Sequence, residues 1–164
     1  FVINFNYGFS FPSTTAVSLA IPFTVRFSNT IPFSFILSSY ADNAKASEIP
    51  ITIFVTAADF SRFQITDLCS LLSNALDNAI RACLQIPYTE GRYIHLKVYE
   101  KNEQLCINLA NSYEEPPVFE NNIPISQRSG HGYGVQSIIS VVDKYQGIYG
   151  FFAENGEFRF QASL

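Results

Sequence analysis

Three polar side chains recur at helical spacing near the middle of the chain: Asn74, Asn78 and Arg81. Steps of four and three residues place them on one face of a helix. Another face of the same segment carries an apolar stripe, formed by Leu68, Leu72, Ala75 and Ala79. Asparagine forms helices poorly because its side chain competes for backbone hydrogen bonds, so two of them in register indicate a use.

The chemistry open to this face is the binding of a metal ion and a phosphate. An asparagine amide oxygen is a hard, neutral ligand that suits Mg²⁺, which usually keeps waters and substrate phosphates among its other ligands. Arg81 lies one turn beyond Asn78 and could hold a phosphate oxygen. Taken alone, Asn74 and Asn78 are explained equally well as solvent-facing or loop-capping residues.

Two further features could belong to the same site. The glycine-rich segment Gly130-His131-Gly132-Tyr133-Gly134 precedes a second helical pattern, so its backbone N–H groups could face an anion. Such turns also serve packing alone, and the spacing is neither a dinucleotide fingerprint nor a P-loop. Asn111 follows an alternating strand, where its amide could read a purine base or simply form a turn.

The elements that must position these residues follow from hydrophobic periodicity and turn signals. The pattern predicts helices over 33–46, 66–85 and 135–145, strands over 51–55, 94–98 and 105–109, and a hairpin of 148–153 with 158–164 across Asn155-Gly156. Thr66 is the expected N-cap of the long helix, and residues 111–130 form a long polar lid or binding loop. This order predicts an α/β (α+β) two-layer sandwich with a mixed β-sheet and helices on one face.

The first 37 residues contain a single charged side chain, Arg26, and alternate aromatic with smaller residues at a strand period. Prolines and hydroxyl side chains interrupt every apolar run before it reaches the roughly 20 residues of a spanning helix. We therefore interpret residues 1–30 as an irregular or strand-like arm and residues 31–164 as the domain. The chain begins with Phe and has no Met, so we expect it to be a fragment.

Composition narrows the class of protein. A chain of 164 residues is long enough for one domain with a real core. The net charge of −4 and the lack of a long basic run argue against nucleic acid as a partner. Cys69, Cys83 and Cys106 are odd in number and widely separated, which predicts reduced thiols in a cytosolic core rather than disulfides or a zinc site.

The order of these features carries a family resemblance: a two-asparagine helix, a hairpin ending in Asn111, a long loop, then G-x-G-x-G and a helix. From about residue 30 to 164 the chain resembles the Bergerat-type nucleotide-binding domain of the GHKL ATPases. Within them it looks like the catalytic ATP-binding domain of sensor histidine kinases. The Gram-positive peptide-sensing kinases are the most similar, in the helix from Asp67 to Ile80 and in the glycine box His131-Gly-Tyr-Gly-Val.

The resemblance implies a role for each residue of the helix face. Asn78 matches the family's Mg²⁺-binding asparagine. Asn74 matches a position that carries a water-activating carboxylate in related ATPases. An amide cannot act as a base, which suits phosphoryl transfer to a side chain better than ATP hydrolysis. Arg81 falls where many histidine kinases have a basic residue near the phosphates, so Asn74 and Arg81 are the implied catalytic residues.

The remaining implied residues bind the nucleotide. Asn111 stands where most of the superfamily has an Asp that reads the adenine amino group, and an amide oxygen can still accept that hydrogen bond. Residues 112–129 would form the ATP lid, whose Arg128 either reaches the γ-phosphate or remains a solvated charge. The phosphate loop would consist of Gly130, His131, Gly132, Tyr133 and Gly134.

The phosphoacceptor histidine of such a kinase is missing, because His95 lies in a predicted strand and His131 in the glycine segment. The resemblance therefore implies a domain that binds ATP and Mg²⁺ and transfers the γ-phosphoryl to a histidine outside this fragment, which would be inactive alone. Its implied partners are the phosphoacceptor and dimerisation segment of the same kinase and a response regulator. The full protein would be a membrane-attached homodimer, with this domain in the cytoplasm.

Two alternatives stay open. One is a GHKL protein-serine kinase of the anti-sigma type, and the other is a nucleotide-binding or docking module without phosphotransfer. Acid-labile phosphate on histidine, acid-stable phosphate on a partner, or binding without transfer would distinguish the three.

Overall fold

A single mixed sheet forms the back of the molecule in the computed structural model, which describes residues 2–4, 31–56, 59–125 and 133–164. Its strand order is β1-β2-β3-β4-β8-β7. The strands are β1 (Val2–Asn4), β2 (Ile51–Val55), β3 (Ile94–Lys101), β4 (Gln104–Ser112), β7 (Ile148–Glu154) and β8 (Glu157–Ser163). β2 and β3 run parallel, and the other neighbouring strands run antiparallel.

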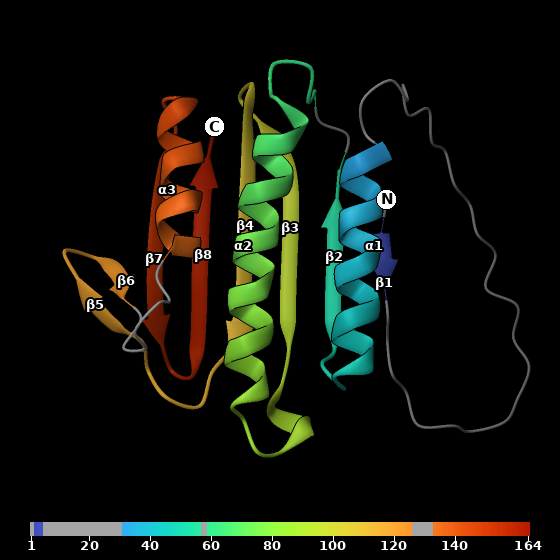
Figure 1. Ribbon diagram of the computed structural model, residues 1–164, viewed down its shortest axis with the longest axis vertical. Coiled ribbons are helices and arrows are strands. Elements are labelled where there is room, and N and C mark those ends of the chain that lie inside the picture. The colour runs from blue at the N-terminus through green and yellow to red at the C-terminus, as the bar shows by residue number, and fades with distance from the viewer. Residues whose placement is uncertain (1, 5–30, 57–58, 126–132) are drawn as a thin grey trace, which may run out of the picture.

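Three helices cover one face of this sheet (Figure 1). They are α1 (Ile31–Ala46), α2 (Ile65–Leu84) and α3 (Tyr133–Lys144), and a short 3₁₀ turn, η1 (Thr89–Gly91), follows α2. Within the described parts of the chain, no helix is both long and apolar enough to cross a membrane. The predicted two-layer sandwich with a mixed sheet is confirmed.

The core lies between the helices and the sheet because the strands alternate as predicted. Ile94, Leu96 and Val98 of β3 are buried, while His95 and Lys97 between them are exposed. On β4 the buried set continues to the end of the strand, with Leu105, Ile107, Leu109 and Asn111. The predicted apolar stripe of α2 is also buried in this core, and it consists of Leu68, Leu72, Ala75 and Ala79. An amphipathic helix and alternating strands thus bury their apolar faces against each other.

Residues 118–125 depart from the expected loop. They form a small hairpin of β5 (Val118–Glu120) and β6 (Ile123–Ile125), which pair only with each other. Asn121 and Asn122 make its turn with positive φ of 50° and 63°. Asparagine tolerates this left-handed conformation, which two-residue hairpins require, so Asn-Asn between apolar residues was an available signal.

All three helix starts differ from the prediction, and α1 begins at Ile31 rather than at residue 33. α2 begins at Ile65 with Gln64 at the N-cap, and no side chain caps it, so the assignment of Thr66 as N-cap is wrong. Instead, the hydroxyl of Tyr145 accepts a hydrogen bond from the Gln64 backbone N–H at 2.8 Å. α3 begins at Tyr133, two residues before the expected start, because Tyr133 and Gly134 already belong to its first turn.

The N-terminal strand and the three cysteines were also subjects of prediction from the sequence. β1 pairs antiparallel with β2, in keeping with the expected strand-like character of the start of the chain. Residues 5–30 lie outside the described residues, so the boundary at residue 30 stays a prediction. All three cysteines are free thiols, and Cys83 is buried.

Candidate functional site

The glycine of the α3 first turn meets the two asparagines of α2. A Cβ placed on Gly134 would lie 3.2 Å from Asn74 Oδ1, and 3.6 Å and 3.7 Å from the amide nitrogen and oxygen of Asn78. Only a residue without a side chain permits this approach comfortably. The structure therefore brings together three residues that the sequence analysis had selected from two distant motifs.

Asn74 is held in one orientation by neighbours on α2 and α3. Its Nδ2 donates to the Ser70 backbone carbonyl at 2.8 Å and to Ser137 Oγ at 3.2 Å. A carbonyl oxygen only accepts, so the NH₂ group must face Ser70. Asn74 Oδ1 consequently turns toward Gly134. Ser137, which the sequence analysis missed, thus links α3 to the asparagine of α2.

Asn78 has the opposite arrangement, because its oxygen is the atom that is engaged. Arg81 Nη2 donates to Asn78 Oδ1 at 2.7 Å, and Arg81 Nε donates to the Asp77 carbonyl at 3.2 Å. The guanidinium is therefore folded back along α2 and carries a positive charge to the Asn78 oxygen. Asn78 is half-buried, whereas Arg81 is exposed.

Asn111 lies on the helix-facing side of the sheet at the end of β4, where its residue is only 2% exposed. Its Nδ2 donates to the Ser112 carbonyl at 2.9 Å, so its Oδ1 is the side-chain atom that can accept from a ligand. Ser112 Oγ accepts from the Tyr93 backbone N–H at 3.0 Å and lies 3.5 Å from Cys83 Sγ. These contacts make a polar, buried support beneath Asn111.

Two residues around Asn111 have raised pKa values. Burial raises the pKa of the Cys83 thiol. Burial, followed by a hydrogen bond to Glu157, raises the pKa of Tyr93 to about 12. Neither Cys83 nor Tyr93 was singled out from sequence for this place, because their contacts join α2, β3 and β4 across the fold.

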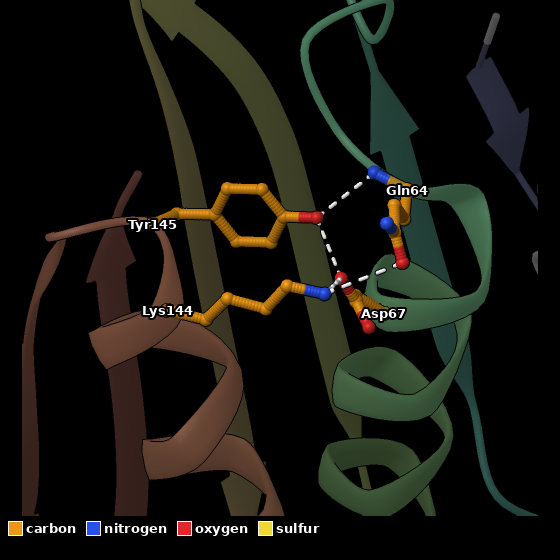
Figure 2. Close-up of polar contacts among 4 residues, drawn as sticks. All are labelled: Gln64, Asp67, Lys144 and Tyr145. Atoms are coloured by element: carbon orange, nitrogen blue, oxygen red, sulfur yellow. Dashed lines mark hydrogen bonds and ion pairs between the residues drawn. The ribbon is translucent and has the colours of Figure 1, made fainter.

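A second polar cluster ties the far end of the same helix pair, and Figure 2 shows it between the start of α2 and the end of α3. Tyr145 donates to Asp67 Oδ2 at 2.6 Å, and Lys144 Nζ lies 2.7 Å from the same oxygen. Lys144 also donates to Gln64 Oε1 at 3.3 Å. We call Gln64, Asp67, Lys144 and Tyr145 the α2–α3 clasp.

The clasp shifts the protonation of its own members. Hydrogen bonds from Lys144 and then Tyr145 lower the pKa of Asp67. The bond to Asp67 raises the pKa of Lys144, and burial followed by that same carboxylate raises the pKa of Tyr145. The cluster is thus internally paired, and it fixes the end of α3 that lies away from Gly134.

The residues near Gly134 fit a magnesium ion that is shared with phosphates. Among the residues that the structure describes, no group of three or more His, Cys, Asp or Glu side chains could hold a metal by itself. The donors present are amide oxygens, which suit Mg²⁺ when substrate phosphates and waters complete its shell. Asn78 is the residue that would hold the ion, since its oxygen already accepts from a cation.

The other predicted site residues have different outcomes. Tyr133 begins α3 and is 82% exposed. Arg128, Gly130, His131 and Gly132 lie outside the described residues, and their roles stay predictions. Gly134, Asn74, Asn78 and Arg81 form one continuous surface across α2 and α3, while Asn111 lies on the sheet beneath the helices.

Comparison with known proteins places this geometry in a family. No curated protein sequence matches the chain. The catalytic domain of the histidine kinase ThkA superposes with a TM-score of 0.61 at 16% identity, covering 84% of this chain and 92% of that one. The mycobacterial sensor histidine kinase MprB gives 0.59 at 16% identity over 80% and 94% of the two chains. The Acinetobacter baumannii histidine kinase AdeS gives 0.58 at 11% identity over 80% and 61%.

At these identities the structural likeness shows the fold, which is that of histidine kinase catalytic domains. The family model of the GHKL domain matches residues 63–164, which include α2, β4, α3 and the closing hairpin. The matched segment holds both asparagines of α2, Asn111 and Gly134. The chain therefore belongs to the GHKL domain family.

Proposed function

We propose that this chain is the ATP- and Mg²⁺-binding catalytic domain of a sensor histidine kinase, which transfers the γ-phosphoryl group to a histidine supplied from outside the chain. The observation that carries the proposal is the approach of Gly134 to Asn74 and Asn78, which joins a helix N-terminus to two amide side chains. Membership of the GHKL family implies ATP binding.

The start of α3 and the glycine segment before it bind the phosphates. Backbone N–H groups of a helix first turn lack partners within the helix and attract anions. Asn78 Oδ1 binds Mg²⁺, which neutralises phosphate charge when it is present. Catalysis then consists mainly of positioning and charge neutralisation, as in other phosphoryl transfers.

Asn74 directs the site toward transfer rather than hydrolysis. Its NH₂ group is already bonded to Ser70 and Ser137, and its oxygen faces Gly134. An amide oxygen can accept a hydrogen bond from an attacking group but cannot remove its proton at neutral pH. The acceptor side chain must therefore lose its proton to a group other than Asn74.

Asn111 reads the base. Because Ser112 fixes its NH₂ group, Asn111 Oδ1 is left to accept a hydrogen bond, and the amino group of adenine supplies one. The segment that follows β4, up to residue 129, serves as the ATP lid, and Arg128 contacts the γ-phosphate. The domain works in the cytoplasm as part of a membrane-anchored homodimer that passes phosphate to a response regulator.

Joining the chain to a kinase phosphoacceptor segment tests the proposal. With radiolabelled ATP and Mg²⁺, we expect acid-labile, base-stable label on histidine, and no label on the 164-residue chain alone. Acid-stable label on a protein substrate would instead support a serine kinase of the anti-sigma type. Nucleotide binding without label in either form would support a docking module, and either result would overturn the histidine kinase assignment.

A further inference from the structure

The guanidinium of Arg81 lies on the oxygen that the proposed function assigns to the metal. Arg81 Nη2 and Asn78 Oδ1 are 2.7 Å apart, and Arg81 Nε is bonded to the Asp77 carbonyl at 3.2 Å. Both bonds run to atoms of α2 itself, so the side chain is held against its own helix. Arginine has donors only, hence the Asn78 oxygen must face it.

The two asparagines of this face therefore differ in charge environment. Asn74 uses its NH₂ group, and its oxygen faces the backbone of Gly134. Asn78 uses its oxygen, and the partner is a full positive charge. The chain thus places a cation at one of the two amide oxygens, and that oxygen is the proposed metal ligand.

Arg81 and a divalent ion compete for this oxygen because both are positively charged. The amide oxygen has two lone pairs, so an N–H group and an ion can both reach it. A magnesium ion on the oxygen would lie about 2.1 Å from it, close to the guanidinium nitrogen that lies 2.7 Å from the same atom. The two positive charges repel each other at such a separation, so loading of the ion weakens the bond between Arg81 and Asn78.

We infer that Arg81 is a stand-in cation for the metal at Asn78. In the metal-free site its charge lies at the proposed metal-binding oxygen and partly neutralises a bound triphosphate, and Mg²⁺ displaces it when the ion loads. The inference rests on the proposed function, and it assigns Arg81 a regulatory effect on metal dependence. A basic residue that contacts phosphate independently of the metal would not show this effect.

The test is the metal dependence of nucleotide binding. For each variant, the dissociation constant of a non-hydrolysable ATP analogue is measured by calorimetry in excess EDTA and in excess Mg²⁺, and the ratio of the two is compared. If Arg81 stands in for the ion, Arg81→Ala weakens binding mainly in EDTA. Since an exposed charge-assisted bond contributes modestly, the EDTA-to-Mg²⁺ ratio should rise about three- to tenfold.

Two further variants define what the ratio reports. Arg81→Gln keeps a hydrogen-bond donor but removes the charge, so its ratio should rise as in Arg81→Ala. Arg159→Ala removes one positive charge from the sheet face that the helices leave uncovered, where Arg159 pairs with Glu154 and Glu157. Its ratio should equal that of the wild type. Arg81 is exposed on α2, so neither of its substitutions threatens the fold.

The outcomes separate the two proposals. An unchanged or lower ratio in Arg81→Ala, with Mg²⁺-dependent binding intact in the wild type, overturns the stand-in role and leaves the proposed function standing. A wild-type chain that binds the analogue in neither buffer overturns the proposed function and this inference with it. A ratio that rises equally in Arg159→Ala reflects net charge and also overturns the stand-in role.

Discussion

The two ends of the α2–α3 pair use polar side chains in opposite ways. At the clasp, Asp67, Lys144 and Tyr145 bond to one another and to Gln64, so their hydrogen-bonding capacity is used internally (Figure 2). At the other end Gly134 leaves space, and the amide oxygen of Asn74 faces it. From this contrast we expect that one end holds α3 in place and that the other contacts the proposed nucleotide.

This division explains why α3 can hold a glycine in its first turn. Gly134 lies in the first turn, where glycine lowers helix stability, yet the helix is anchored at its opposite end by Tyr145. Ser137, between these two positions along α3, joins α3 to α2 by accepting a hydrogen bond from Asn74. Substitutions at the clasp should therefore change stability, and substitutions near Gly134 should change binding.

Gly134→Ala should have the largest effect on nucleotide binding. The added Cβ would lie 3.2 Å from Asn74 Oδ1, which is tight, and at ordinary contact distance from Asn78. Asn74 must move aside to relieve this contact, since unrelieved overpacking would cost about 1–3 kcal/mol of folding stability. Its oxygen then leaves the proposed site, and ATP-analogue affinity should fall about tenfold, the equivalent of about 1.4 kcal/mol. Stability should fall by less than the full overpacking cost, because Asn74 is half-buried and alanine favours helix. Calorimetric titration and thermal unfolding measure the two quantities.

Gly91→Ala is the matched control for that variant. A Cβ at Gly91 would meet Ile86 Cγ2 at 3.5 Å, an ordinary contact, and no asparagine atom lies within 4 Å of it. Its analogue affinity should equal that of the wild type. If Gly134→Ala binds the ATP analogue as tightly as Gly91→Ala, the close approach of α3 to the asparagines does not contribute to nucleotide binding.

Tyr145→Phe tests the clasp. The ring contact with Phe63 is kept, but the hydroxyl bonds to Asp67 and to the Gln64 backbone are lost. The free energy of unfolding should fall by about 1–2 kcal/mol, with analogue affinity changed less than twofold. Urea unfolding measures it, and Tyr88→Phe, at an exposed tyrosine, should leave stability unchanged. A large loss of affinity without loss of stability would contradict the division.

Ser137→Ala tests the hydrogen bond that joins α3 to Asn74 of α2. Without this hydroxyl, Asn74 loses one of the acceptors that orient its amide. Analogue affinity should fall about three- to fivefold, the size of one neutral hydrogen bond, and Ser137→Thr should restore most of it. Ser140→Ala, on the exposed side of α3, is the control. Equal affinities for Ser137→Ala and Ser140→Ala would remove Ser137 from the site.

Acid sensitivity should be the smallest effect, and it belongs to the clasp. The pKa of Asp67 is lowered by Lys144 and Tyr145, so its stabilising contribution is complete above the ordinary aspartate pKa of about 4. It is lost as pH falls below that value through the folded-state pKa. Urea unfolding between pH 7 and pH 3 should show a smaller acid loss for Asp67→Asn than for the wild type. Identical losses would show that Asp67 has no altered pKa in the folded chain.

Local periodicity was sufficient to predict most of the fold. The stripe of α2, the alternation of β3 and β4 and the Asn155-Gly156 turn are short-range patterns, and each appears in the structure as expected. The β5–β6 hairpin was missed because its strands are three residues each, too short for a clear period. The start of α2 was misplaced because Tyr145, 81 residues away, supplies the contact to Gln64.

The site could be predicted in type but not in orientation. Helical spacing, the order of the motifs and the family resemblance together selected Asn74, Asn78, Arg81 and Gly134, and the fold brings them together. Which atom of each amide faces the ligand depends on Ser70, Ser137 and Ser112, whose contacts are set by packing of α2, α3 and β4. The clasp had no local sequence signal, because Lys144 and Tyr145 lie 77 and 78 positions after Asp67 in the chain.

The central claim is that Asn78 binds Mg²⁺ in an ATP site, and one measurement tests it most directly. ATP-analogue binding is titrated with Mg²⁺ for the wild type, for Asn78→Ala and for Asn43→Ala, an exposed asparagine of α1. We predict that Mg²⁺ tightens binding in the wild type and in Asn43→Ala, and that this gain disappears in Asn78→Ala. An undiminished Mg²⁺ effect in Asn78→Ala would contradict the account.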